Sequence, residues 1–214
     1  MKRRTLDIAF SIGGILLAAL FLVLGLVMTS NARFSHNYVR DQLRQQQITF
    51  KTADTLTAEE KASPCLVKYA GQALETGKQA ECYANNFIGL HVKSVANGAT
   101  YATLGDTQTA LKTQIAAATK AGDTAKVATL NNQLNTVNTQ RDTLFKGETL
   151  RGLLLTSYGF SQFGEKAAQG ATVAYIGAGL LALLSIAGFA HAMVTPKTKG
   201  FAVPAAEERE AVSA

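Results

Sequence analysis

Two long apolar runs that lack Asp, Glu, Lys and Arg stand near opposite ends of the chain, at residues 8–28 and 171–194. At about 1.5 Å per residue, a helix over either run is long enough to cross a hydrocarbon core of roughly 30 Å. Between them, polar residues dominate and apolar ones recur at helical spacings of three and four. The sequence therefore predicts an all-α protein with two transmembrane helices flanking a helical domain, and the lipid bilayer as a partner.

The first part of the region 29–170 predicts short helices joined by turns. A continuation of the first span is expected to reach about residue 48, and Thr57 followed by Glu60 has the spacing of a capping box. A segment over residues 64–75 is expected to end at Gly77. An amphipathic helix should follow, closed by Asn97 and Gly98 and built on Ala80, Tyr83, Phe87, Leu90 and Ser94.

Residues 105–144 predict a projecting helical hairpin. Asp106 and Asp123 are natural N-caps for its two helices, and the turn is expected around Gly122. A thin apolar seam has nearly heptad spacing, and it fits either packing of the two helices on each other or recruitment of a partner helix. The seam residues are Leu111, Ile115, Val127, Leu130, Leu134 and Val137.

The segment before the second span carries one apolar face, formed by Leu150, Leu153, Leu154 and Tyr158. We expect this face to lie on the outer membrane surface or to cap the base of the domain.

Small residues follow one face of each predicted span. Helices pack closely in lipid where side chains are small, so these stripes predict contact between the two spans or with a partner's helix. The stripe residues are Ser11, Gly14, Ala18 and Gly25 in the first span, and Ala174, Ala178 and Ala182 in the second.

Basic residues at both ends orient the chain. Lys2, Arg3 and Arg4 precede the first span, and Lys197 and Lys199 follow the second. Because such residues stay in the cytoplasm, both tails, 1–7 and a disordered 195–214, are expected inside the cell membrane and the region 29–170 outside it. The first run exceeds the 7–15 apolar residues of a cleaved signal peptide, which favours an uncleaved signal-anchor over cleavage.

The chain has two cysteines, Cys65 and Cys82, and both lie in the segment expected outside. An oxidising compartment favours a disulfide, worth roughly 3 kcal/mol by chain entropy. A simple reversal of the chain at Gly77 would leave the two residues roughly 10 Å out of register, so the bond needs a bend near Gly71. Two buried free thiols are the alternative.

No pattern in the chain predicts a catalytic, cofactor or metal site. His36 and His91 lack the spacing of metal ligands, and His191 at the end of the second span fits an interfacial side chain better than proton or metal chemistry. The net charge of +6 comes without a basic and aromatic patch, so no nucleic-acid partner is expected.

Three segments resemble a family of small two-span membrane proteins of actinobacteria. They are the opening RRTLD with Gly13 and Gly14 in the following span, residues 86–101 (NFIGLHVKSVANGATY) and residues 144–155 (LFKGETLRGLLL). Some members carry the label of aromatic ring-opening dioxygenase. That chemistry needs two histidines and a carboxylate in one compact arrangement, which His36 and His91 do not predict.

The leading hypothesis is a non-enzymatic membrane protein whose outer domain binds or scaffolds another envelope protein, as an accessory or assembly factor of a membrane complex. Deleting residues 105–140 would then remove the partner. The alternative is an extracytoplasmic sensor or ligand-binding module, which would signal through a separate partner because residues 195–214 are too few to fold.

Overall fold

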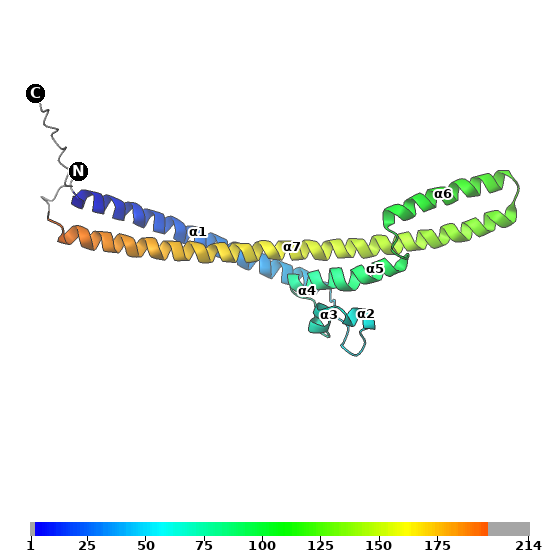
Figure 1. Ribbon diagram of the computed structural model, residues 1–214, viewed down its shortest axis with the longest axis horizontal. Helices are drawn as coiled ribbons and strands as arrows, with labels where there is room; N and C mark the ends of the chain where they lie inside the picture. Colours follow the sequence, from blue (N-terminus) through cyan, green and yellow to red (C-terminus); the bar gives the residue numbers. More distant parts are fainter. Residues whose placement is uncertain (1–2, 197–214) are drawn as a thin grey trace, which may run out of the picture. The chain divides into compact units, whose positions relative to one another are not determined.

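The computed structural model describes residues 3–196, and these are organised almost entirely as helices (Figure 1). The predicted disordered tail falls largely outside the described residues, as do Lys2, Lys197 and Lys199. Within residues 3–196 the one β-pairing is an isolated antiparallel bridge between Thr49 and Ala73, so the all-α prediction is confirmed. The helices are α1 (Arg3–Gln45), α2 (Ala58–Lys61), α3 (Pro64–Tyr69), α4 (Gly77–Cys82), the π-helix η1 (Tyr83–Ile88), α5 (Gly89–Val95), α6 (Tyr101–Lys120) and α7 (Thr124–Val194).

Two compact units divide the described chain. The first contains residues 3–32 and 166–196, and the second is Arg33–Glu165. By length and composition, α1 and α7 each include a stretch able to cross a membrane. The boundaries 8–28 and 171–194 and the orientation of the spans stay predictions.

Small residues bring α1 and α7 together within the first unit. A Cβ atom added at Gly14 would collide with Ser185 Oγ, and one added at Gly188 would collide with Ser11 Oγ. The Tyr175 ring lies 2.6 Å from where a Cβ atom on Gly25 would stand. The stripe residues Ala18, Ala174 and Ala178 are buried and Ala182 is half-buried. The predicted stripe residues therefore lie in the contact between α1 and α7 within this unit.

The core of the second unit gathers around the short helices. Its buried members come from α1, α3, α4, η1, α7 and the intervening loops, and they include Val39, Leu43, Phe50, Leu66, Leu74, Ala80, Ile88 and Leu154. Leu154 is 3% exposed, whereas its neighbour Leu153 is 62% exposed. The apolar face predicted over residues 150–158 is thus divided, with one side in the core and the other open.

Helix α6 folds back along the beginning of α7 as a hairpin (Figure 1). Leu111, Leu130 and Val137 are buried in its seam, and Ile115, Val127 and Leu134 are packed against them. The Asp123 carboxylate accepts a hydrogen bond from the Lys126 amide at 3.0 Å, as expected of an N-cap. Since the seam is filled by the hairpin's own side chains, the pattern is explained by self-packing.

The prediction for Asp106 is wrong, because α6 begins earlier than expected. Thr100 caps the helix through a capping box with Thr103, and Asp106 lies in the second turn. The Thr100 hydroxyl accepts a hydrogen bond from the Thr103 amide and the Thr103 hydroxyl accepts one from the Thr100 amide, so the helix has already begun before the Gly105-Asp106 pair is reached.

The sequence predicted that Gly77 ends the segment before it. This prediction is wrong, because Gly77 begins α4. Thr76 caps that helix in a capping box with Gln79. A Cβ atom at Gly77 would collide with the Ser161 side chain of α7, so glycine is needed for close approach of two helices. The chain bends instead at Gly71, whose φ is +72°. Helix α1 also ends at Gln45, slightly short of the expected residue 48, with Gln47 at a φ of 52°.

Candidate functional site

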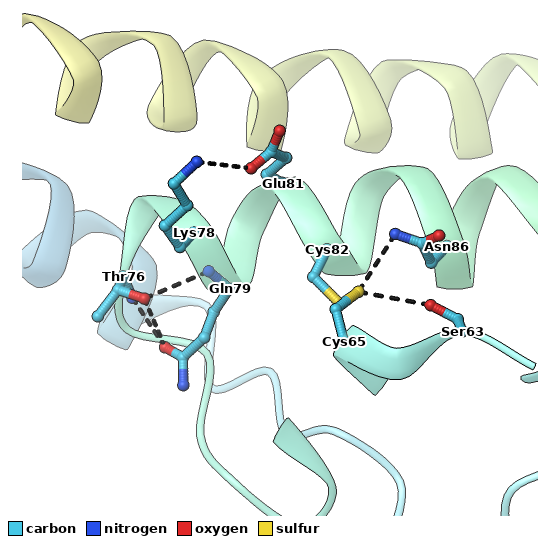
Figure 2. Close-up of a disulfide and its surroundings, with 8 residues drawn as sticks. All are labelled: Ser63, Cys65, Thr76, Lys78, Gln79, Glu81, Cys82 and Asn86. Atoms are coloured by element: carbon cyan, nitrogen blue, oxygen red, sulfur yellow. Dashed lines mark hydrogen bonds and ion pairs between the residues drawn. A yellow bond between two sulfur atoms is a disulfide. The ribbon is translucent and has the colours of Figure 1, made fainter. Parts of the chain in front are cut away.

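A disulfide joins α3 to the end of α4 (Figure 2). The Cα atoms of Cys65 and Cys82 are 6.0 Å apart, within the range that a disulfide needs. The bend at Gly71 supplies the change of register that a reversal at Gly77 would not have given. Asn86 Nδ2 donates a hydrogen bond to Cys65 Sγ at 3.2 Å, so the bridge also contacts η1.

Glu60 is the most deeply buried charged residue in the part of the chain described, with 0% exposure. One carboxylate oxygen accepts a hydrogen bond from the Thr57 amide at 2.8 Å, which completes the predicted capping box and confirms it. The other accepts one from Lys51 Nζ at 2.8 Å and lies 3.5 Å from His91 Nε2. The carboxylate therefore ties a loop, α2 and α5 together.

The charge on Glu60 is stabilised by these neighbours. The hydrogen bond from Lys51 is the largest cause of a lowered pKa for Glu60, and it outweighs the opposing effect of burial. Burial, assisted by the nearby Glu60 charge, raises the pKa of Tyr83. The arrangement has the features of an internal anchor: a carboxylate held ionised by fixed donors.

The three histidines considered in the sequence analysis do not come together at one site in the described residues. His36 is exposed on α1, and His91 is half-exposed, with Nδ1 2.7 Å from the Phe87 carbonyl oxygen. In the first unit, His191 Nδ1 lies 2.9 Å from Asp7 Oδ2. No group of three or more His, Cys, Asp or Glu side chains is arranged to hold a metal ion within residues 3–196.

An open apolar hollow of about 470 Å³ lies between residues 38–46, at the C-terminal end of α1, and residues 150–160 of α7 in the second unit. Its exposed apolar members are Tyr38 at 50%, Leu150 at 37%, Leu153 at 62% and Phe160 at 37%. The rings of Tyr38 and Phe160 meet edge to face, with 5.6 Å between their centroids. Uncharged polar residues also line it: Gln42, Gln46, Thr156 and Ser157. We call this surface the apolar hollow.

One hydrogen bond joins the two helices that form the walls of the apolar hollow. Ser35 Oγ donates a hydrogen bond to the Phe160 carbonyl oxygen at 2.7 Å, which fixes α1 against α7. Val39, Leu43 and Leu154 form the floor and belong to the buried core. The sequence indicated Leu150 and Leu153 as apolar but assigned them to the membrane surface or the base of the domain. Their pairing with Tyr38 and Phe160 required the packing of two distant segments.

Comparison with protein-family models, with characterised proteins and with solved structures finds no match for this chain. The fold itself defines the class: an all-α protein with two helices of membrane-spanning length and composition. The resemblance to an actinobacterial family stays a prediction.

Proposed function

We propose that this chain is a non-enzymatic integral membrane protein whose unit Arg33–Glu165 lies outside the cytoplasmic membrane and binds another protein of the cell envelope. The basic residues at both ends of the chain support this orientation. The sequence contains none of the motifs that mark common catalytic sites, which favours an accessory or assembly role.

The observation that carries the proposal is the apolar hollow. Large apolar side chains that are one-third to two-thirds exposed, gathered around one depression, are costly to leave in water and mark interaction surfaces. An apolar centre with polar neighbours is the usual anatomy of a protein interface. A surface that faced lipid would not need Gln42, Gln46, Thr156 and Ser157 beside it.

The occupant we propose is an amphipathic helix of the partner. Two helices form the walls of the hollow, and such grooves accept a helix whose apolar residues recur every three or four positions. The lining has no charged side chain, so the partner's helix should have neutral polar residues flanking its apolar stripe. The hairpin seam is less suited to this role, because its own side chains fill it.

Photo-crosslinking in living cells tests the proposal. A photoreactive benzoylphenylalanine introduced at Leu153 should capture one envelope protein, and mass spectrometry should map the linked peptide to an amphipathic helix. Val67 is the matched control, because it is 47% exposed in the same unit but does not line the hollow. Capture of lipid alone at Leu153, or of the same proteins from both positions, would contradict the proposal.

A further inference from the structure

Two open hollows adjoin Tyr101 at the base of the hairpin in the unit Arg33–Glu165. One has a volume of about 930 Å³ and the other about 460 Å³, and Tyr101 lines both. Its side chain is 45% exposed, and its ring centroid is 5.9 Å from that of Phe145, which is 57% exposed. Tyr101 thus contributes an exposed aromatic ring to two depressions, each lined by both polar and apolar side chains. We call this arrangement the Tyr101 surface.

The larger hollow presents a fixed arginine. Arg151 donates through Nη1 to Glu148 at 3.2 Å and through Nη2 to the Asn85 side-chain oxygen at 3.3 Å. Its Nε is buried and has no hydrogen-bond partner among the described residues. Asn85 and Asn86 are exposed side chains of the π-helix η1, a distortion that often accompanies functional sites.

The smaller hollow repeats the same residue types. The Arg141 guanidinium lies 4.1 Å from the Tyr101 ring centroid, stacked in a cation–π contact. Gln108 Nε2 donates to the Asn138 side-chain oxygen at 2.6 Å, and Asp142 supplies a carboxylate. Each hollow therefore combines a guanidinium, a carboxylate and side-chain amides beside a shared aromatic ring.

Charge is balanced in both hollows. Arg151 and Lys93 oppose Glu59 and Glu148 in the larger one, and Arg141 opposes Asp142 in the smaller one. A ligand with a strong net charge would find no complementary excess here. The lining instead offers donors and acceptors side by side, which suits a neutral ligand whose groups act as both.

We propose that the Tyr101 surface binds a neutral oligosaccharide. A hydroxyl group is both donor and acceptor, so neighbouring sugar hydroxyls match planar amide, guanidinium and carboxylate groups. The apolar face of a pyranose ring packs on an exposed aromatic side chain, which Tyr101 and Phe145 provide, and two hollows that share Tyr101 leave room for more than one sugar unit of a chain. Access to envelope polysaccharides rests on the outward placement proposed above.

The test uses the full-length protein in a polyoxyethylene detergent, because sugar-based detergents would compete. Chitotetraose, cellotetraose, mannotetraose and the neutral peptide tetra-alanine are each titrated at millimolar concentration, with binding followed by saturation-transfer NMR and calorimetry. At least one tetrasaccharide should bind saturably, and Tyr101→Ala and Arg151→Gln should each weaken that binding about fivefold or more. Helical content and the disulfide are checked in every variant. Asn138→Ala tests the smaller hollow and should also weaken binding of the tetrasaccharide.

Tyr38→Ala and Arg40→Gln are the matched controls. Tyr38 has nearly the same exposure as Tyr101 but lines the apolar hollow, and Arg40 is exposed and lines neither of the Tyr101 hollows. Both variants should keep full saccharide binding, while Tyr38→Ala alone should weaken capture of the protein partner. Failure of every tetrasaccharide to bind, binding of tetra-alanine instead, or undiminished binding by Tyr101→Ala would overturn the inference. Because these readouts use purified protein, they are independent of the partner and of the membrane orientation.

Discussion

At the scale of single residues, the sequence predicted hydrogen bonds between near neighbours in the chain but did not predict which charged residue is buried. The spacing of Thr57 and Glu60 predicted a capping box, and both of its hydrogen bonds are present. Nothing in that spacing indicated that Glu60 is fully buried, because Lys51 and His91 reach it from other segments. A charged residue in a helix's first turn is ordinarily solvated, so this anchor became visible only with the tertiary structure.

Replacing the Glu60 carboxylate should destabilise the unit Arg33–Glu165 in a pH-dependent way. We expect Glu60→Gln to cost about 1–3 kcal/mol near neutral pH, since the Lys51 ammonium loses its charged partner. The pKa of Glu60 is held below its ordinary value of 4.5, so the stabilisation is complete above that value and is lost as the pH falls through the folded-state pKa. The difference between wild type and variant should therefore shrink in acid.

Denaturant unfolding at several pH values, followed by Tyr fluorescence, measures this difference. Glu59→Gln is the control, because Glu59 is the exposed neighbour in the same helix. An equal loss in both variants, or a Glu60→Gln effect that grows in acid, would disagree with the assigned role.

At the scale of elements, apolar periodicity identified the helices better than it identified their ends. The hairpin seam and the small-residue stripes fall where the pattern placed them, since both follow from a repeat of about 3.6 residues. The roles of Gly77 and Asp106 were predicted wrongly. Glycine occurs at helix ends and at close helix contacts, and aspartate at N-caps and inside helices, so the role depends on the neighbouring elements. The π-helix η1 was not predicted, because the apolar spacings of three and four across Tyr83, Phe87 and Leu90 also fit an ordinary α-helix.

The disulfide should stabilise the unit Arg33–Glu165 by joining two short helices. Each of α3 and α4 has six residues, too few to be stable alone. Reduction should lower the free energy of unfolding by about 3 kcal/mol, as expected for closing a loop of 17 residues. Thermal unfolding with and without a phosphine reductant measures the effect, and the doubly substituted variant Cys65→Ser, Cys82→Ser should show no response to reductant. A wild-type midpoint of thermal unfolding that does not change with reductant would contradict a stabilising disulfide.

Two neighbouring glycines provide a matched test of the contact between α1 and α7. Gly14→Ile places side-chain atoms against Ser185, whereas a Cβ atom at Gly13 meets no atom within 4 Å. We expect Gly14→Ile to separate the helices and Gly13→Ile to be tolerated. The readout is disulfide formation between cysteines introduced as Ser11→Cys and Gly188→Cys in the Cys65→Ser, Cys82→Ser background. Equal crosslinking in the two glycine variants would argue against this packing.

At the scale of the whole molecule, the sequence predicted two membrane-length helices and the helical region between them, but neither the apolar hollow nor the Tyr101 surface. Each apolar run is defined by its length and composition alone, whatever it packs against, so both membrane-length helices were predictable. The apolar hollow and the Tyr101 surface each bring together residues far apart in sequence, such as Tyr38 with Phe160. Their members look like ordinary helix positions when read singly, and so neither surface was predicted.

Orientation in the membrane is tested by single cysteines in the Cys65→Ser, Cys82→Ser background. A membrane-impermeant maleimide applied to intact cells should label Thr113→Cys in α6 and should leave Arg4→Cys unlabelled until the cells are lysed. This outcome follows from basic residues remaining in the cytoplasm. Labelling of Arg4→Cys in intact cells would reverse the proposed orientation.

The most direct test of the central proposal is quantitative co-purification from native membranes in a mild detergent. The full-length wild type, Leu153→Gln and Val67→Gln would be compared, with bound proteins identified and counted. The account predicts one stoichiometric membrane partner with the wild type and Val67→Gln, reduced at least about tenfold with Leu153→Gln because a polar amide in the apolar hollow costs about 1.4 kcal/mol or more. A wild-type protein that purifies alone, or a partner retained fully by Leu153→Gln, would contradict it.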